Sequence, residues 1–236
     1  MAVLMFVAPV LPGQTEANRQ FGKELVSTRQ KEHVASRKRL GWTSEQVWHQ
    51  VNPDGSVIII PRLGMDDPEK TLKALAASTD PFDVYFKKKV LEQNGLDFNK
   101  PLSGPRPEKI FDLRSPPAGR VTHLASAFPI LPGKTQKTRE VAKTLSGPKR
   151  QEYQAASQAA GLVTEEWWIN QTPKGDFVIA YWEAPNPVDA ILHSVKHPTE
   201  VDRWLFQAMK ETTGIDFSDL KNVPTKWPET IIDWKA

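Results

Sequence analysis

Hydrophobic positions follow two spacings along the chain, one typical of buried strands and one of helices. Apolar runs of about six residues precede Leu11-Pro12-Gly13 and Leu131-Pro132-Gly133, and each predicts a buried strand. After each run, a four-residue apolar spacing predicts a long helix that begins at Thr15 or Thr135 as the N-cap. The predicted helices end near Gly41 and Gly161, and Gly147-Pro148 predicts a kink or a restart in the second one.

The two runs belong to an internal repeat, because the sequence aligns with itself at an offset of 120 residues. Without a gap, 15 of the 49 positions from 11 to 59 are identical to their counterparts. Later the register changes by a residue, but Gly95-Leu96-Asp97-Phe98 still matches Gly214-Ile215-Asp216-Phe217. We infer a tandem duplication of one unit.

Each copy carries the same further elements. Two strands, 45–51 and 56–62, are joined by Asn52-Pro53-Asp54-Gly55, which is strong turn chemistry, and their counterparts are 165–171 and 176–183. Helix starts with an N-cap followed by proline are predicted at Asp67-Pro68, Asn186-Pro187, Asp80-Pro81 and His197-Pro198. Ile110–Leu113 and Ile231–Trp234 predict a last short strand. The order β-α-β-β-α-β is the ferredoxin-like pattern, in the α+β class.

These elements predict two units, 1–114 and 122–236, with a proline-rich linker at 115–121. A ferredoxin-like unit covers one face of its sheet with helices and leaves the other face bare. Two such units in one chain can bury their bare faces against each other, which predicts a barrel packed sheet to sheet. We therefore expect a monomer that is an intramolecular pseudo-dimer.

Composition excludes several classes of protein. The 236 residues carry a net charge of only +3, which argues against a nucleic-acid partner. The densest basic run, Arg37-Lys38-Arg39, is interpreted as a solvated helix face. No cysteine is present, so disulfides, thiolate metal sites and cysteine nucleophiles are excluded.

The apolar N-terminus resembles a secretory signal in composition, but it lacks a basic segment. Its apolar pattern recurs at 124–131, where a signal would have no place and a buried strand would. No other apolar stretch approaches membrane-spanning length, so we expect no membrane partner and a cytoplasmic location.

Strand alternation separates a mixed polar and aromatic face from a more apolar one. If Val51 pairs with Ser56, the mixed face of the first copy consists of Gln46, Trp48, Gln50, Val57 and Ile59. The corresponding face of the second copy consists of Glu166, Trp168, Asn170, Phe177, Ile179 and Tyr181. The apolar faces, expected under the helices, are Val47, His49, Ile58, Ile60 and Arg62, and Trp167, Ile169, Val178, Ala180 and Trp182.

The mixed faces supply the candidate ligand-binding residues, namely Trp48, Gln50, Glu166, Trp168, Asn170 and Tyr181. The competing interpretation is that Trp48 and Trp168 fill the core between the sheets. Glu166 is the candidate catalytic base, since an apolar interior would raise its pKa. Its neighbour Glu165 must point to the opposite face, which argues against a catalytic pair of carboxylates.

The five histidines have no metal-ligand spacing, so capping or surface roles are expected and no metal site is predicted. Gly133-Lys134-Thr135 imitates the end of a phosphate-binding loop, but Phe128 stands where that loop needs glycine, so it is interpreted as a helix start.

The segment from Ser78 to Lys87, together with Gly95-Leu96-Asp97-Phe98 and Pro105-Arg106-Pro107-Glu108, resembles the dimeric α/β-barrel superfamily and an uncharacterised ferredoxin-like family within it. The second copy departs from the pattern from His197 to Trp204. The resemblance implies the fold. Its members include cofactor-free monooxygenases, isomerase-like enzymes, haem-binding enzymes and stress-response proteins, so it assigns no reaction.

These observations predict a protein that binds a small apolar or aromatic molecule between its sheets, with a cofactor-independent monooxygenase- or isomerase-like activity as one form of that function. The alternatives are a non-enzymatic structural, interaction or stress-response protein with a packed interior, and a haem enzyme ligated by His49 or His193. No cofactor is predicted under the leading interpretation.

Overall fold

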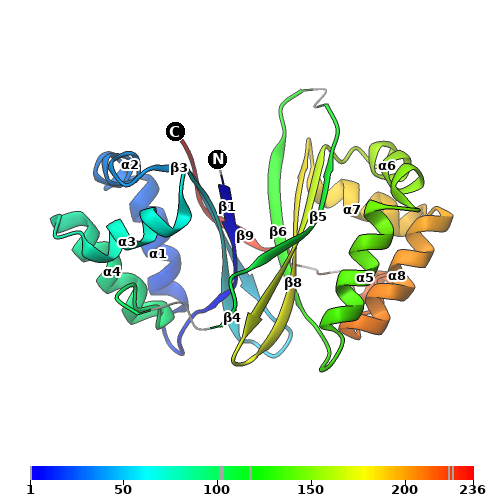
Figure 1. Cartoon of the computed structure of the whole chain (residues 1–236), viewed down its shortest axis with the longest axis horizontal. Helices are drawn as coiled ribbons and strands as arrows, with labels where there is room; N and C mark the ends of the chain where they lie inside the picture. Colours follow the sequence, from blue (N-terminus) through cyan, green and yellow to red (C-terminus); the bar gives the residue numbers. More distant parts are fainter. Residues whose placement is uncertain (1, 101–103, 117–118, 223, 225) are drawn as a thin grey trace. The chain divides into compact units, whose positions relative to one another are not determined.

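The computed structural model describes residues 2–100, 104–116, 119–222, 224 and 226–236. The chain forms two compact units. Unit 1 comprises Met1–Ser103 together with Pro228–Ala236, and unit 2 comprises Gly104–Trp227. Over these described residues, both units combine an antiparallel sheet with four α-helices, as the α+β assignment predicts (Figure 1).

The sheet of unit 1 has the order β1-β4-β3-β9, with the short β2 also paired to β4. Its strands are β1 (Ala2–Met5), β2 (Ala8–Pro9), β3 (Trp42–Val51), β4 (Val57–Met65) and β9 (Glu229–Lys235). Its helices are α1 (Thr15–Val26), α2 (Gln30–Arg39), α3 (Pro68–Ala77) and α4 (Pro81–Asn94). The apolar N-terminal run thus forms strands, as the repeat predicts.

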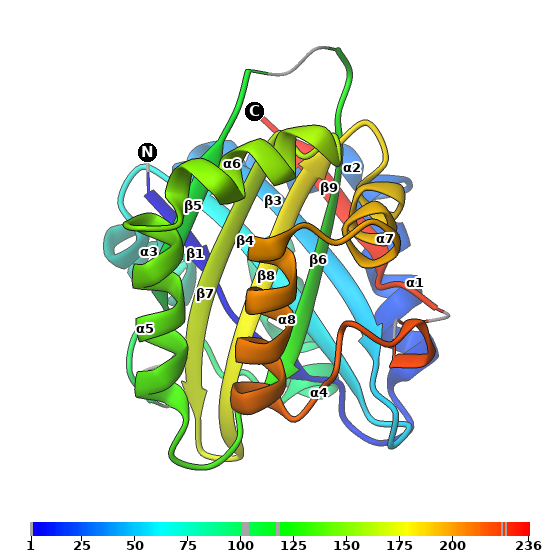
Figure 2. The same ribbon diagram turned by 90° about the vertical axis from the view of Figure 1, so that its right-hand side faces the viewer.

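The sheet of unit 2 has the order β5-β7-β8-β6. Its strands are β5 (Glu108–Arg114), β6 (Thr122–Pro129), β7 (Thr164–Thr172) and β8 (Gly175–Ala184). Its helices are α5 (Thr135–Ser146), α6 (Arg150–Ala159), α7 (Pro187–Lys196) and α8 (Glu200–Thr213), followed by a short 3₁₀ turn, η1 (Leu220–Asn222). Figure 2 shows the helices of this unit on one face of its sheet.

In each unit the main hydrophobic core lies between the sheet and its helices. In unit 1 it includes Phe21 and Leu25 of α1 against Val47 and Ile59 of the sheet. In unit 2 it includes Val141 and Leu145 of α5 against Trp167 of β7. The four-residue helical spacing seen in the sequence therefore marks the sheet-facing stripe of each helix.

The last strand of each repeat belongs to the sheet of the other unit. β5 follows α4 in sequence but pairs with β7, and the C-terminal β9 pairs with β3. The compact units therefore differ from the predicted division at 1–114 and 122–236, which assigned each last strand to its own repeat. Of the predicted linker, Pro117 and Ala118 lie outside the described residues.

The long first helix predicted for copy one is wrong, because the structure breaks it into α1 and α2. The chain leaves the helix at Ser27, whose hydroxyl donates to the Lys23 carbonyl while the Arg29 amide donates to Glu24. Such local hydroxyl bonds compete with the helical ladder. The second copy breaks at the same place, Gly147, as its Gly-Pro pair predicts. Both second helices end before a left-handed glycine, Gly41 or Gly161.

The predicted face assignment is right for copy two and wrong for β4 of copy one. In copy two, Thr172 pairs with Gly175 across a two-residue turn, so Trp168 opposes Ile179 as predicted. In copy one, Asn52 and Ser56 close a longer loop and Val51 pairs with Val57, not Ser56. This one-residue difference exchanges the faces of the β4 residues, because side chains alternate along a strand. Val57 and Ile59 therefore lie under the helices. Ile58, Ile60 and Arg62 instead share the face of Trp48. His49, opposite Ile59, lies on the helix-covered face as predicted.

Helix starts with an N-cap before proline are confirmed at three of four sites. Asp67, Asp80 and Asn186 each accept a bond from a backbone amide in the first turn. At the fourth site the helix starts later than predicted, since Thr199 caps α8 and forms a capping box with Asp202. Thr15 and Thr135 are first helical residues and not N-caps.

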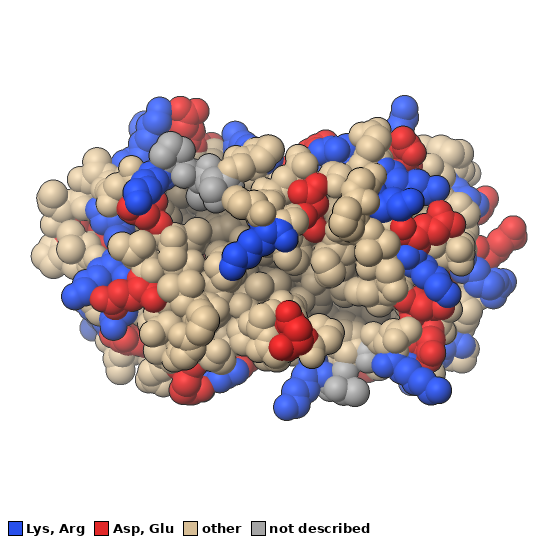
Figure 3. All heavy atoms as spheres, turned by 90° about the horizontal axis from the view of Figure 1, so that it is seen from below, with Lys and Arg blue, Asp and Glu red and all other residues tan. Residues whose placement is uncertain are grey.

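Among the described residues, no helix combines the length and apolar character needed to cross a bilayer. Figure 3 shows Lys and Arg side chains interspersed with Asp and Glu on the face it draws.

Candidate functional site

The residues predicted to bind a ligand all lie on the helix-free face of their sheet. Gln50 is half-buried, and the other five are buried, namely Trp48, Glu166, Trp168, Asn170 and Tyr181. Burial agrees with both sequence interpretations, a ligand-lined face and a packed core. The ligand-binding role of these residues stays a prediction.

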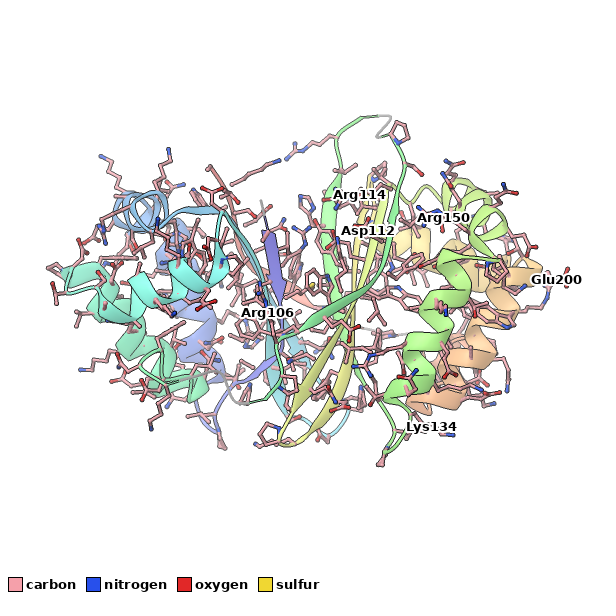
Figure 4. All side chains as sticks on the ribbon, in the orientation of Figure 1. Arg106, Asp112, Arg114, Lys134, Arg150 and Glu200 are labelled. Atoms are coloured by element: carbon pink, nitrogen blue, oxygen red, sulfur yellow. The ribbon has the colours of Figure 1, made fainter. Side chains whose placement is uncertain are left out.

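Glu166, the predicted base, is fully buried and has cationic partners. Its Oε1 accepts a bond from Arg114 Nη2 at 3.1 Å and lies 3.7 Å from Lys109 Nζ. Trp168 donates its indole N–H to Oε2 at 3.3 Å. Arg114 extends from β5 beside Asp112, which binds its Nε at 2.9 Å (Figure 4). A buried glutamate bonded to an arginine is a structural arrangement as much as a catalytic one.

Tyr181 belongs to a polar cluster on the same face of unit 2. Its hydroxyl donates to Glu183 Oε1 at 2.6 Å and lies 2.8 Å from Nδ1 of His123. The hydrogen bond between His123 and Glu183, opposed by burial and assisted by Thr164 and Tyr181, lowers the pKa of Glu183 to about 2. Tyr181 is thus fixed by its neighbours.

A cavity of about 110 Å³ lies on the opposite, helix-covered side of the unit 2 sheet. It is lined by β7 and β8 on one side and by α6, α7 and α8 on the other, with further walls from β6 and from the segment that follows α8. Its lining is mostly aromatic and aliphatic, and its polar residues are Tyr153, Glu165, Ser194 and Asp202. No lysine, arginine or histidine is among its described lining residues. This is the usual make-up of a ligand site, an apolar hollow with a few polar groups.

Glu165 is the charged group on the sheet wall of this cavity. It is 3% exposed and accepts three hydrogen bonds from neutral donors. Tyr153 donates its hydroxyl to Oε2 at 2.7 Å, and the indoles of Trp167 and Trp182 donate to Oε1 at 2.8 and 3.1 Å. Glu165 and Glu166 point to opposite faces, as strand alternation predicts, because Glu165 pairs across the sheet with Trp182 and Glu166 with Tyr181.

Burial raises the pKa of Glu165 above its ordinary value, and the nearby Asp202 carboxyl adds to the rise. The three hydrogen bonds act in the opposite direction without cancelling it. Burial and the negative charge of Glu165 also raise the pKa of Tyr153 well above its ordinary value, so its phenol stays protonated and donates. Glu165 is therefore a carboxyl that can take up a proton more readily than an exposed glutamate.

The equivalent residue of unit 1, Glu45, has an entirely different environment. It is also 3% exposed, but Arg37 Nε lies 2.5 Å and His33 Nε2 lies 2.7 Å from its Oε2. Burial alone would raise the pKa of Glu45, yet Arg37 and His33 lower it to about 2. The interpretation of Arg37 as part of a solvated helix face is wrong, because the side chain is fully buried.

A second pair of equivalent carboxyls shows the same difference in basic partners between the two units. Asp83 of unit 1 is fully buried and bound by Ser36 at 2.5 Å and by Arg39 at 2.6 Å. Its counterpart Asp202 lines the unit 2 cavity and accepts two bonds from Thr199 at Oδ2. Both carboxyls are thus kept in the second copy, but their basic partners are not. Tyr153, Ser157 and Ala159 replace His33, Arg37 and Arg39.

The histidines do not all have the predicted capping or surface roles. His193 and His197 are exposed, as expected, but His33 is buried against Glu45. His49 is buried on the helix-covered face of unit 1, and neither ring nitrogen has a hydrogen-bond partner among the described residues. Burial lowers the pKa of His49, which favours the neutral ring.

Sequence reasoning did not find the Glu165 site. It excluded a pair of adjacent carboxylates correctly but looked for function only on the helix-free face. The signal lay in the helix before the strand, at positions where the copies differ in charge. The second copy has Tyr153 in place of His33 and Ser157 in place of Arg37. Glu165 is therefore retained without the two basic partners of Glu45.

No protein-family model matches the sequence, and no curated protein matches it. Among solved structures, an anthrone oxidase-like protein is similar over 97% of this chain and 88% of its own, with 15% identity and a TM-score of 0.48. A candidate monooxygenase of Lactobacillus acidophilus is similar over 90% of this chain and 89% of its own, with 11% identity and a TM-score of 0.49. One of Fusobacterium nucleatum covers 89% of this chain and 85% of its own, with 6% identity and a TM-score of 0.46. Identities this low do not transfer an activity.

Proposed function

We propose that unit 2 binds a small apolar or aromatic molecule in its cavity and that Glu165 accepts a proton or hydrogen bond from it. Such a site suits a cofactor-independent enzyme of the isomerase- or monooxygenase-like kind, in which a proton leaves the substrate first. This proposal keeps the ligand class expected from the sequence, but it moves the ligand from the helix-free face to the cavity beneath the helices.

The size of the cavity limits the ligand. A dry cavity of about 150 Å³ lined by aliphatic and aromatic side chains binds benzene, so about 110 Å³ suits a molecule of roughly one ring or a few carbons. The apolar walls would contribute the larger part of the binding free energy, since burial of apolar surface is worth about 25 cal/mol per Å².

One observation carries the proton-accepting role. Glu165 is a buried carboxyl whose hydrogen-bond donors are all neutral, and its raised pKa brings it closer to neutral pH, where a general base works best. The two indoles and the phenol also fix its position, so the carboxyl is pre-oriented against the cavity.

The experiment uses two ligands of nearly equal size observed by fluorine NMR. Fluorobenzene reports whether the cavity is occupied, and 4-fluorophenol adds one hydroxyl that can donate to Glu165. We expect saturable binding of both, with the phenol bound more tightly. Glu165→Gln should reduce the preference for phenol and leave the binding of fluorobenzene in place.

Two variants serve as controls. Ala180→Leu places extra volume on the cavity wall and should abolish the binding of both ligands. Glu166→Gln changes the neighbouring carboxyl on the other face and should leave both affinities unchanged. Absence of saturable binding in the wild type overturns the proposal, and a phenol preference that depends on Glu166 moves the site to the face predicted from the sequence.

A further inference from the structure

Unit 1 contains a buried guanidinium, that of Arg37, whereas the described lining of the unit 2 cavity has no cationic side chain. The Arg37 guanidinium lies within a frame made by the Glu45 carboxylate and the rings of Trp42 and Phe86. Its Cζ lies 4.4 Å from the ring centre of Trp42 and 4.1 Å from that of Phe86. Arg37 also donates to both carboxylate oxygens, from Nε at 2.5 Å and Nη2 at 3.2 Å.

The equivalent frame in unit 2 surrounds the cavity. The counterparts of Glu45, Trp42 and Phe86 are Glu165, Leu162 and Leu205, and all three line the hollow. The counterpart of Asp83, Asp202, lines it as well. The residues that surround a guanidinium in one unit therefore correspond to residues that line a cavity in the other, with both carboxyls retained.

We propose that the ligand of unit 2 carries a protonated nitrogen, an ammonium or amidinium group on a small apolar body, seated against Glu165 where Arg37 is seated against Glu45. This inference rests on the proposed function, because it names the class of molecule that the same cavity takes. Glu165 then acts as the carboxylate that accepts a hydrogen bond from that nitrogen.

The local polar groups support a cation at this point. Tyr153 replaces His33 on Oε2, and two indoles occupy Oε1, so the donors to Glu165 among the described residues are neutral and do not balance its charge. Ser157, in the place of Arg37, is 3% exposed, and its hydroxyl lies near Tyr153 without hydrogen-bond geometry to any described group. A buried carboxylate without a cation is costly, and a ligand that supplies one removes that cost.

The body of the ligand must be apolar. The other cavity walls are mostly aromatic and aliphatic, including Ile191, Phe206 and Met209. A strongly hydrated metal ion or a polyamine without an apolar part would leave these walls unfilled. A one-ring amine fits both the charge and the walls.

The test compares 4-fluorobenzylamine with 4-fluorobenzyl alcohol by fluorine NMR at pH 7, since the two differ in charge but hardly in size. A charge-assisted bond to Glu165 should favour the amine by a factor on the order of ten. In Glu165→Gln the preference should fall to about one, while in Glu166→Gln it should persist.

A second variant restores the arrangement of unit 1. Ser157→Arg supplies a guanidinium from within the chain, and we expect it to abolish amine binding because the side chain occupies the frame. Equal binding of alcohol and amine overturns this inference and leaves the proposed function standing. If neither compound binds, the proposed function itself fails. A preference for amine that survives in Glu165→Gln also overturns the assignment to this carboxyl.

Discussion

Arg37 Nε lies 2.5 Å from Glu45 Oε2, and neither side chain is more than 3% exposed. At the same position of the second unit, Ser157 leaves Glu165 without a basic partner among the described lining residues. One glutamate therefore stabilises a core through an ion pair, while its counterpart forms the wall of a cavity. The difference between the two environments follows from this exchange and from the strand residues Trp167 and Trp182, whose indoles donate to Glu165.

The two glutamates should respond in opposite ways to the same substitution. Glu45→Gln leaves Arg37 buried without its counter-charge, and breaking such a pair costs about 3–5 kcal/mol. Glu165→Gln removes a buried carboxyl that has no cationic partner in the described part of the chain and keeps an oxygen for the indoles, so the free energy of unfolding should stay equal or rise. Urea unfolding of both variants measures the difference. Equal losses in the two variants would contradict the assignment of Glu165 as unpaired.

The pH dependence of the same variants follows from the two pKa shifts. The pKa of Glu45 is lowered to about 2, so its stabilisation is complete above about 4.3, the value in the unfolded chain, and is lost as pH falls toward 2. The deficit of Glu45→Gln relative to wild type should therefore shrink on acidification in that window.

The raised pKa of Glu165 gives the opposite behaviour. Below about 4.3 the carboxyl is protonated in both states, and between that value and the raised pKa the native state alone holds the proton. Wild type should lose stability across that window, and Glu165→Gln should not. Thermal melts at several pH values measure this, and a difference between the two proteins that does not grow with pH would exclude the raised pKa.

Local chemistry made many elements predictable from the sequence. Asp67-Pro68 and Asn186-Pro187 start helices because the side chain accepts an amide bond and proline fits the first turn. Gly95 and Gly214 end the fourth helix of each unit because each adopts a left-handed conformation that other residues rarely take.

Features that depend on distant partners were not predictable. The apolar pattern of β9, which includes Ile232, specifies a strand but not its neighbour, and the structure pairs it with β3. Likewise, the sequence shows Arg37 only as part of a basic run, and the fold is needed to place it beside Glu45. The predicted pairing of the hairpin in copy one was wrong for a different reason, because one additional loop residue changes which residues of β4 face the helices.

Gly22 shows how closely helix α1 approaches the exchanged strand β9. A Cβ added at this position would lie 3.0 Å from the Cβ of Ile231 and 3.2 Å from its carbonyl oxygen. Gly22→Ala should therefore destabilise unit 1 by about 1–3 kcal/mol through overpacking, although alanine favours helices. The equivalent residue of unit 2 is already an alanine, Ala142, which is fully buried.

Rescue distinguishes this contact from a general effect on the helix. Ile231→Val removes one methyl group from the crowded partner and should recover part of the loss in the Gly22→Ala background. Chemical unfolding of the two single variants and the double variant gives the coupling between the positions. Strictly additive effects would show that Gly22 and Ile231 do not share the strain.

Removal of the C-terminal residues Pro228–Ala236 tests the strand exchange directly. Because β9 pairs with β3, its loss should expose the edge of the unit 1 sheet and the surface of α1 that contacts β9. It also removes the buried side chains of Ile231 and Ile232, and the burial of each contributes about 1.5–3 kcal/mol to stability. Hydrogen exchange detected by mass spectrometry should then show faster exchange in β3, while α5 and α8 of unit 2 stay protected. If each repeat instead kept its own last strand, the same deletion would unprotect β7 and spare β3. A variant with Ile232→Ala in the intact chain provides the milder control, since it weakens the core of unit 1 but keeps the backbone pairing between β9 and β3.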